Sequence, residues 1–139
     1  MVDFQDFVKQ IFNEQYEKSF GSTMLEKLEA RDYFFKRQEK GNLIALLHAQ
    51  QTLENIHIKA LVVEPNYQKQ GLGASLLAEL EEKAMAEGVS SITLSTKSYQ
   101  ARDFYLKQGY EIYASLNDVP QKGITKYHFI KRLSWDFLN

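Results

Sequence analysis

Two closely spaced glycines, Gly71 and Gly73, stand between a predicted strand and a predicted helix. The first amide groups of a helix have no acceptors within the helix and carry the positive end of its dipole, so they attract anions. Glycine at this point lets an anion approach the backbone without meeting a side chain. The segment Gln68–Ser75 is therefore predicted to bind a phosphate group.

This segment differs from the two commonest nucleotide-binding motifs. A P-loop requires Lys-Ser or Lys-Thr after its second glycine, and neither pair is present. A dinucleotide fingerprint requires a third glycine, where Leu76 stands. The remaining pattern is Gln/Arg-x-x-Gly-x-Gly/Ala, matched by Gln68, Gly71 and Gly73. Taken alone, this pattern also fits a simple reversal of the chain.

A second cluster follows downstream at Ala101, Tyr105, Gly109 and Tyr110. The spacing predicts a helix from about Ser98 to Gln108, with Gly109 in the left-handed position past its end. The same helical spacing also fits a tyrosine buried in the core.

The hydrophobic pattern predicts the elements that position both segments. The order of these elements predicts an α/β fold, with a mixed, mostly antiparallel central sheet flanked by helices, in a single domain spanning residues 1–139. The predicted helices are 4–16, 24–30, 72–84 and 98–108, the predicted strands are 31–38, 43–49, 56–63, 92–94, 110–116 and 125–133, and residues 135–138 form an apolar tail expected to pack on the domain.

The strand at residues 56–63 is apolar on both faces, so it is predicted to be central in the sheet. Simple alternation places His57 on the same face as Leu61 and Val63. Ile56, Ile58, Ala60 and Val62 are expected on the opposite face.

Composition excludes several classes of function. Seventeen Lys and Arg against 18 Asp and Glu leave no basic excess for a nucleic-acid partner. The absence of Cys excludes disulfides and cysteine nucleophiles, and no metal ligand set is assigned to His48 or His128. No apolar stretch is long enough to span a membrane, and residues 1–4 do not resemble a signal peptide, so we expect a soluble cytoplasmic protein with no membrane partner.

The two clusters together resemble the GNAT superfamily of N-acetyltransferases, which transfer an acetyl group from acetyl-CoA to an amine. Gln68, Gly71 and Gly73 resemble the family's pyrophosphate-binding motif. Ala101 and Tyr105, followed by Gly109-Tyr110, resemble its Asn-x-x-Ala-x-x-x-Tyr-x-x-x-Gly-Phe/Tyr motif.

The resemblance implies that acetyl-CoA is the cosubstrate, with no metal. Its pantetheine arm would run along Leu61, Val62 and Val63 through backbone groups. The thioester would then lie in a gap where this strand and Ile92–Thr96 separate. The residues implied in cofactor binding are Leu61, Val62, Val63, Gln68, Lys69, Gln70, Gly71, Leu72, Gly73, Ala74, Ser75, Ser98, Ala101 and Tyr105.

The resemblance also implies the catalytic groups. Tyr105 would protonate the departing thiolate, which requires either a lowered pKa or a strong hydrogen bond to sulfur. His57 matches the position where family members often place a glutamate base, and Glu64 or a water chain are the alternatives. Without an acyl-carrying residue, the predicted mechanism is direct attack by a primary amine in a ternary complex.

Three features depart from the family pattern. Gln68 replaces the commoner arginine, with Lys69 as a possible substitute for its charge, and Ser98 replaces an asparagine while remaining able to cap the following helix. The family's usual first strand is not visible before Phe4. The acceptor is a small molecule or a peptide of open identity, and a homodimer is possible. The alternative function is a non-catalytic module that binds acyl-CoA.

Overall fold

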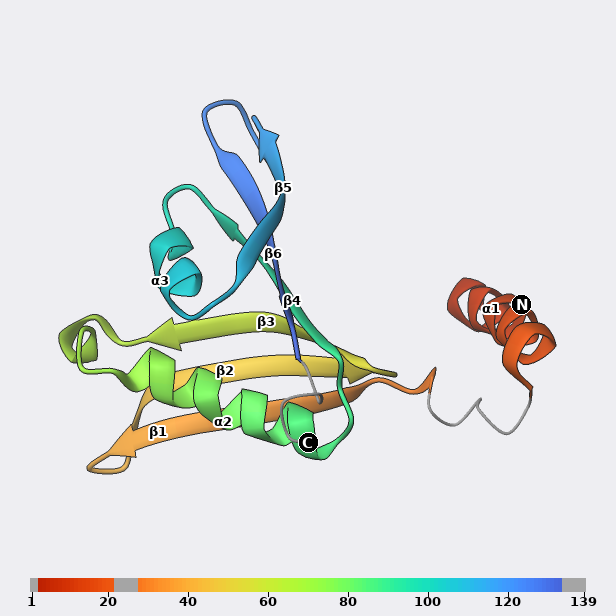
Figure 1. Cartoon of the computed structure of the whole chain (residues 1–139), viewed down its shortest axis with the longest axis horizontal. Helices are drawn as coiled ribbons and strands as arrows, with labels where there is room; N and C mark the ends of the chain where they lie inside the picture. The colour runs from red at the N-terminus through yellow and green to blue at the C-terminus, as the bar shows by residue number, and fades with distance from the viewer. Residues whose placement is uncertain (1–2, 22–27, 134–139) are drawn as a thin grey trace.

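The computed structural model describes residues 3–21 and 28–133. Its central feature is a six-stranded sheet with helices α2 and α3 packed against it, while helix α1 lies apart (Figure 1). The strands are β1 (Arg31–Glu39), β2 (Asn42–Thr52), β3 (Asn55–Val63), β4 (Ser91–Lys97), β5 (Glu111–Asn117) and β6 (Thr125–Arg132). The helices are α1 (Phe4–Phe20), α2 (Leu72–Ala86) and α3 (Arg102–Lys107), with a short 3₁₀ turn, η2 (Pro65–Tyr67).

The sheet order is β1-β2-β3-β4-β6-β5. β1, β2 and β3 form an antiparallel meander, β3 pairs with β4 in parallel, and β6 pairs antiparallel with both β4 and β5. The predicted α/β class, with a mixed and mostly antiparallel sheet, is confirmed. That the whole of residues 1–139 forms one domain stays a prediction.

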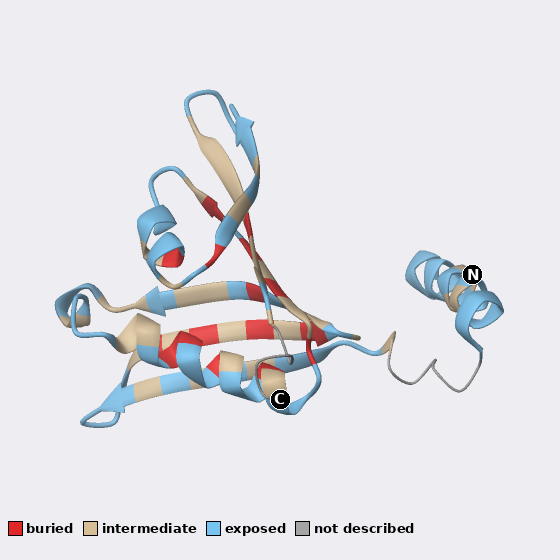
Figure 2. Cartoon of the chain, in the orientation of Figure 1, coloured by how far each residue is buried: buried red, intermediate tan, exposed pale blue. Residues whose placement is uncertain are grey.

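The core lies between α2 and the face of the sheet that α2 covers, here called the inner face (Figure 2). The predicted helix at 72–84 is confirmed, and the four residues that α2 buries recur at one-, three- and four-residue steps, so they lie on one face of the helix. Removal of these side chains from water supplies the main energy that holds α2 on the sheet. They are Leu76, Leu77, Leu80 and Ala84, and they pack with Leu47, Ile56, Ile58 and Ile92 of the sheet.

Helix α3 is shorter than the predicted helix at 98–108. Residues 97–100 form a turn instead, in which the amide of Gln100 donates to the carbonyl of Lys97 over 2.8 Å. The amide of Ser98 donates to the carbonyl of Thr125 (2.8 Å), which ties this turn to the start of β6. The predicted helix at 24–30, apart from its last residues, and the tail at 135–138 lie outside the described residues.

A β-bulge changes which face of β3 each residue occupies. Ala49 pairs with Ile58 but His48 pairs with Ala60, so Lys59 is an extra residue that reverses the alternation. Leu61 and Val63 pack against the core on the inner face, whereas His57 is exposed on the opposite, outer face. The prediction that His57 shares a face with Leu61 and Val63 is therefore wrong, because simple alternation cannot anticipate a bulge.

The first described residues begin with a capped helix. The Asp3 carboxylate accepts hydrogen bonds from the amides of Gln5 (2.8 Å) and Asp6 (3.4 Å) and so defines the start of α1. Within residues 3–21, no strand precedes this helix. Among the described helices, none combines the length and apolar character needed to cross a bilayer.

Candidate active site

The strands β3 and β4 separate after three residue pairs. Their parallel pairing runs from Asn55 opposite Ser91 to His57 opposite Thr93 and then stops. Beyond this point β3 continues to Val63 and β4 to Lys97 without pairing with each other. The gap between two parallel strands that the family resemblance implied is therefore present, and it leaves backbone groups of both strands available to a ligand.

The N-terminus of α2 follows β3 through the η2 turn (Figure 1). Gly71 caps the helix with φ +82°, a left-handed conformation that other residues adopt at a cost, and no side chain caps the helix there. The first intrahelical bond runs from the amide of Ser75 to the carbonyl of Gly71 (2.9 Å). Helix geometry therefore leaves the amides of Leu72, Gly73 and Ala74 without intrahelical acceptors, which suits them to an anion.

Gly73 serves close packing. A Cβ atom at this position would lie 3.3 Å from Cζ of Phe104 on α3 and 4.0 Å from Cγ2 of Val63 on β3. The missing side chain therefore lets the first turn of α2 contact both elements. The expectation that both glycines clear space for an anion is corrected for Gly73, whose bare Cα faces other side chains.

The three polar residues before Gly71 differ in their contacts. Nε2 of Gln68 donates to the carbonyl of Val63 over 3.1 Å, so this side chain turns back toward β3. Lys69 and Gln70 are exposed, and Lys69 has a left-handed backbone (φ 64°). Lys69 can therefore place its charge near the α2 N-terminus only through a solvated side chain.

Arg37 is a cation at this helix terminus that the sequence pattern did not reveal. Its Nη2 donates to Oγ of Ser75 (2.9 Å), in the first turn of α2, and its Nη1 pairs with Oε1 of Glu79 (3.0 Å). Arg37 reaches α2 because it follows Tyr33 and Phe35 on the inner face of β1. No local motif marks this residue, because only the packing of β1 against α2 brings it there.

His57 lies at the point where β3 and β4 diverge. Its Nδ1 is 2.9 Å from Oγ1 of Thr93. Partial burial lowers the pKa of His57 below 6.5, and the positive charges of Lys59, His128 and Lys126 lower it further. The imidazole is therefore neutral at pH 7 and can accept a proton.

Tyr105 is buried in an aromatic cluster on the inner side of the sheet. Its ring makes edge-on contacts with Phe104 (5.1 Å between centroids) and Tyr110 (5.8 Å) and a tilted contact with Phe129 (5.7 Å). Burial raises the pKa of Tyr105 to about 12. Of the two conditions stated for protonating a thiolate, a lowered pKa is therefore not met, and donation of a hydrogen bond remains.

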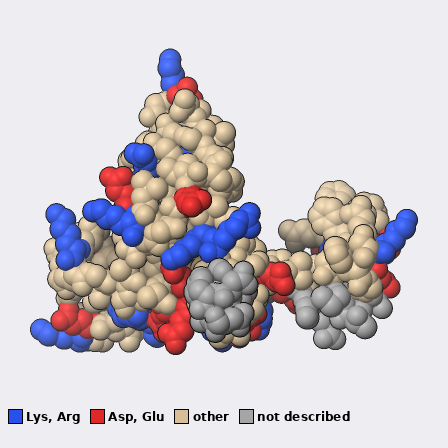
Figure 3. Space-filling view, viewed as in Figure 1, with Lys and Arg blue, Asp and Glu red and all other residues tan. Residues whose placement is uncertain are grey.

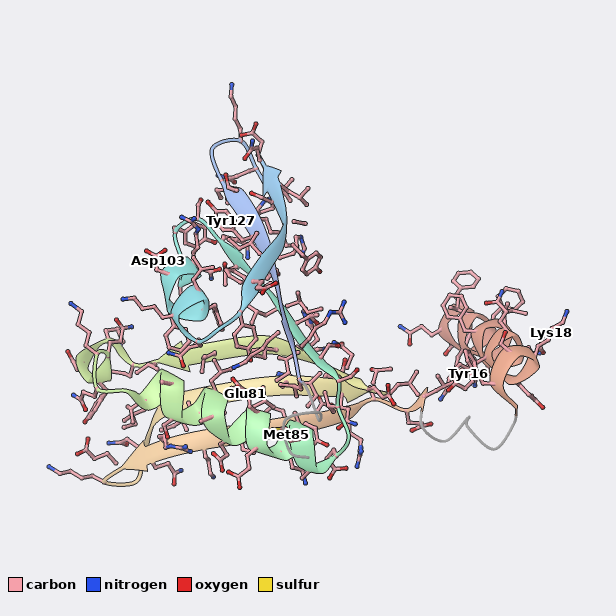
Figure 4. The ribbon with its side chains drawn as sticks, in the orientation of Figure 1. Tyr16, Lys18, Glu81, Met85, Asp103 and Tyr127 are labelled. Carbon is pink, nitrogen blue, oxygen red and sulfur yellow. The ribbon has the colours of Figure 1, made fainter. Side chains whose placement is uncertain are left out.

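A half-buried ion pair holds this cluster against α2. Oε1 of Glu81 accepts from Nζ of Lys131 (2.7 Å), and Oε2 accepts from the hydroxyl of Tyr110 (3.3 Å). Figure 4 labels Glu81 on α2. Burial, with the neighbouring Glu81 carboxylate, raises the pKa of Tyr110. The hydroxyl of Tyr110 is thus engaged in holding the structure together.

Two other predicted residues have structural partners. The Ser98 hydroxyl accepts from the amide of Thr125 (3.2 Å), and the N-cap of α3 is Ala101 with no side-chain bond. The prediction that Ser98 caps this helix is wrong, because the helix starts later. The carboxylate of Glu64 accepts from the amide of Asn66 (3.2 Å) and so caps the η2 turn.

A buried hydroxyl without a partner lies on β4, in the stretch that has diverged from β3. Oγ1 of Thr96 has no hydrogen-bond partner among the residues that the structure describes, although Thr96 is only 6% exposed. Buried polar atoms in folded proteins nearly always have partners. Within the described ranges, no cluster of three or more His, Asp or Glu side chains could hold a metal ion.

Comparisons with known proteins agree with this geometry. The family model of the acetyltransferase (GNAT) family matches residues 5–110. The chain therefore belongs to the GNAT family and is an acetyltransferase, as its two motifs indicated.

Two characterised relatives are similar in sequence. A blasticidin-S acetyltransferase of Streptomyces morookaense is 33% identical over 96 residues, which are 68% of this chain and 70% of the relative. The alanine N-acetyltransferase of ribosomal protein bS18 from Escherichia coli K12 is 31% identical over 85 residues, 61% of this chain. The match spans only 55% of that enzyme.

Solved structures share the fold. An acetyltransferase from Bacillus cereus superimposes with a TM-score of 0.79 at 28% identity, over 93% of this chain and 91% of that one. An aminoglycoside 6'-N-acetyltransferase with coenzyme A bound superimposes with a TM-score of 0.67 at 16% identity, over 91% of each chain, a likeness of fold alone.

Proposed function

We propose that this acetyltransferase transfers the acetyl group of acetyl-CoA to a primary amine by direct attack in a ternary complex. The observation that carries the proposal is the gap between β3 and β4. The N-terminus of α2, which no side chain caps, lies beside the open end of this gap, and His57 lies at the other end, where the two strands pair. Family membership favours turnover over the alternative of a non-catalytic acyl-CoA-binding module.

The α2 N-terminus is proposed to hold the pyrophosphate. The amides of Leu72, Gly73 and Ala74 are oriented by the helix and need no side chain to bind an anion. We assign Arg37 a supporting role, because its guanidinium already contacts Ser75 in the same turn. A phosphate there would compete with Glu79 for this cation.

The diverging strands are proposed to hold the pantetheine arm. Backbone groups of Leu61, Val62 and Val63 lie on the part of β3 that β4 leaves unpaired. The unpaired hydroxyl of Thr96 on β4 offers a further partner for an amide of that arm. Together these features fit an extended ligand with alternating amide groups.

The bound thioester supplies an electrophilic carbonyl carbon. In the proposed reaction the amine nitrogen forms a bond to this carbon, the bond from carbon to sulfur breaks, and the amine loses a proton. His57 accepts that proton, directly or through water, since its imidazole is neutral at pH 7. Tyr105 donates a hydrogen bond to the sulfur as negative charge develops there.

The test has two stages. Calorimetric titration of coenzyme A into the folded protein is expected to show binding, and the absence of binding would overturn the proposal. Thiol release is then measured with acetyl-CoA and a panel of amines: blasticidin S, an aminoglycoside and a peptide with an N-terminal alanine. We expect turnover with at least one such primary amine. Binding without turnover across a broad amine panel would instead support the non-catalytic module. A cytoplasmic location stays a prediction.

A further inference from the structure

Two lysines stand directly opposite each other on the outer face of the sheet. Lys97 of β4 pairs with Lys126 of β6 in the antiparallel register. Their neighbours lie on the inner face, because Thr96 is buried and Tyr127 packs against the core, so alternation places both lysines on the outer side. Like charges directly opposite each other destabilise a sheet, and this arrangement therefore favours an anion beside them.

A third lysine lies on the other side of the gap between β3 and β4. Ile58 is buried in the core, so the next residue of β3, Lys59, projects on the outer face. It comes two residues after His57, the last residue of β3 that pairs with β4. The charges of Lys59 and Lys126 both lower the pKa of His57. Positive charge therefore reaches the imidazole from both sides of the gap.

Among the described residues, these cations have no acidic partner. None of the three lysines takes part in an ion pair there. Asp32, on the same face, is already bonded to Nε2 of His48 (2.8 Å), and Glu111 lies on β5, two strands away from β4. The charged groups that shift the pKa of His57 are all basic.

This local excess of positive charge does not follow from composition. The whole chain has a formal net charge of -1. On the face of the molecule seen in Figure 3, acidic side chains lie among the basic ones over much of the surface. The cations beside the gap are thus a local feature, placed where the amine is expected to meet the thioester.

From these observations we propose that the acceptor carries an anionic group, a carboxylate or a phosphate, close to its primary amine. Lys59 and Lys126 bind that group on the outer face, while the amine lies at His57. Lysine has a long flexible stem, so one anion can be reached from both sides of the gap. The position of the amine rests on the proposed function, whereas the binding of an anion to this face does not. Polycationic amines are disfavoured at the same place by like charge.

The test measures binding apart from turnover. The probes are two matched pairs, phosphoethanolamine with ethanolamine and β-alanine with its amide, so that one arm tests a phosphate and the other a carboxylate. NMR titration follows the imidazole signals of His57 and of His128, which lies opposite Ser95 on the same face. Titrations are run with coenzyme A present, to occupy the N-terminus of α2, and are repeated without it. In at least one pair, we expect the anionic member to bind about tenfold more tightly, with a smaller difference at high salt.

Charge removal provides the variants. Lys126→Gln also removes a like-charge contact with Lys97, so this variant should stay folded. We expect it to reduce the preference for the anionic probe about threefold, and Lys59→Gln should act in the same direction. The matched control is Lys107→Gln, an exposed lysine in the last turn of α3, which should keep the preference.

Failure of this inference and failure of the proposed function give different results. Equal or weaker binding of the anionic member in both pairs, or an unchanged preference in both lysine variants, would overturn the anion site. Acetylation of amines without an anionic group at a higher kcat/KM than the anionic ones would also overturn it, while acetyl transfer would stand. Binding of an anionic probe beside His57 without acetylation of any amine would support the anion site and count against the proposed function.

Discussion

Nδ1 of His57 lies 2.9 Å from Oγ1 of Thr93, and these two residues form the last pair of β3 and β4 before the strands diverge. The threonine hydroxyl fixes the orientation of the imidazole at that point. An imidazole so held, with its pKa lowered by burial and by nearby positive charge, is suited to accept a proton from an amine. At this site, the end of the parallel pairing between β3 and β4 therefore coincides with a side chain that can accept a proton.

Replacement of His57 tests its role as the base. We expect His57→Ala to lower kcat about 100-fold, a typical contribution of a general base. The pKa of His57 lies below 6.5, so activity of the unmodified enzyme should rise with pH up to about that value as the imidazole loses its proton. The variant should lose this rise, as measured by pH profiles between about pH 5 and 8. An unchanged profile would exclude His57 as the base.

Replacement of Tyr105 tests the hydrogen bond to sulfur. Tyr105→Phe keeps the ring contacts with Phe104 and Phe129, so the fold should be retained. We expect kcat to fall about 10- to 100-fold, with little change in the KM for acetyl-CoA. With its pKa at about 12, Tyr105 stays protonated near neutrality, so its ionisation causes no loss of activity there.

The matched control is Tyr110→Phe. It removes another buried hydroxyl of the same cluster, one that bonds to Glu81. This variant should lower the Tm while kcat remains near its original value. Equal losses of kcat in both tyrosine variants would point to damage of the cluster as a whole.

An added methyl group at Gly73 tests the packing beneath the α2 N-terminus. In Gly73→Ala the new Cβ lies 3.3 Å from Cζ of Phe104, so the phenyl ring or the first turn of α2 has to shift. Displacement of the first turn of α2 should weaken coenzyme A binding about fivefold by calorimetry. A second change, Phe104→Leu, makes room and should restore much of the affinity. Full affinity in Gly73→Ala would show that the turn tolerates the contact.

Charge removal at Arg37 tests its contact with phosphate. We expect Arg37→Gln to weaken coenzyme A binding about fivefold at low salt and to reduce its dependence on ionic strength. Arg31→Gln is the matched control, because Arg31 also joins β1 to α2 through a pair with Glu87 (3.4 Å), but at the other end of the helix. Equal effects of the two variants would indicate a general electrostatic influence.

Local pattern alone identified most of the elements and both motifs. The change in hydrophobic period from two to 3.6 predicted β3 and α2, and Gly109 was predicted to adopt the left-handed backbone that it has (φ 88°). These features depend on residues close together in the chain, since side-chain spacing and backbone freedom act over a few residues. The glycine turn and Tyr105 could therefore be recognised from residue types and spacing.

Tertiary structure alone decided the arrangement of the site. The bulge at Lys59 reversed the faces of β3 and separated His57 from Leu61 and Val63. Arg37 reached the α2 N-terminus through the packing of β1, and the exposed position of α1 followed from contacts it does not make with the sheet. Strand register and long-range packing join residues that are distant in sequence, so no local pattern encodes them. Residue types and their spacing in the sequence were enough to predict the chemical groups of the site. Which face of the sheet each group occupies could be known only from the folded chain.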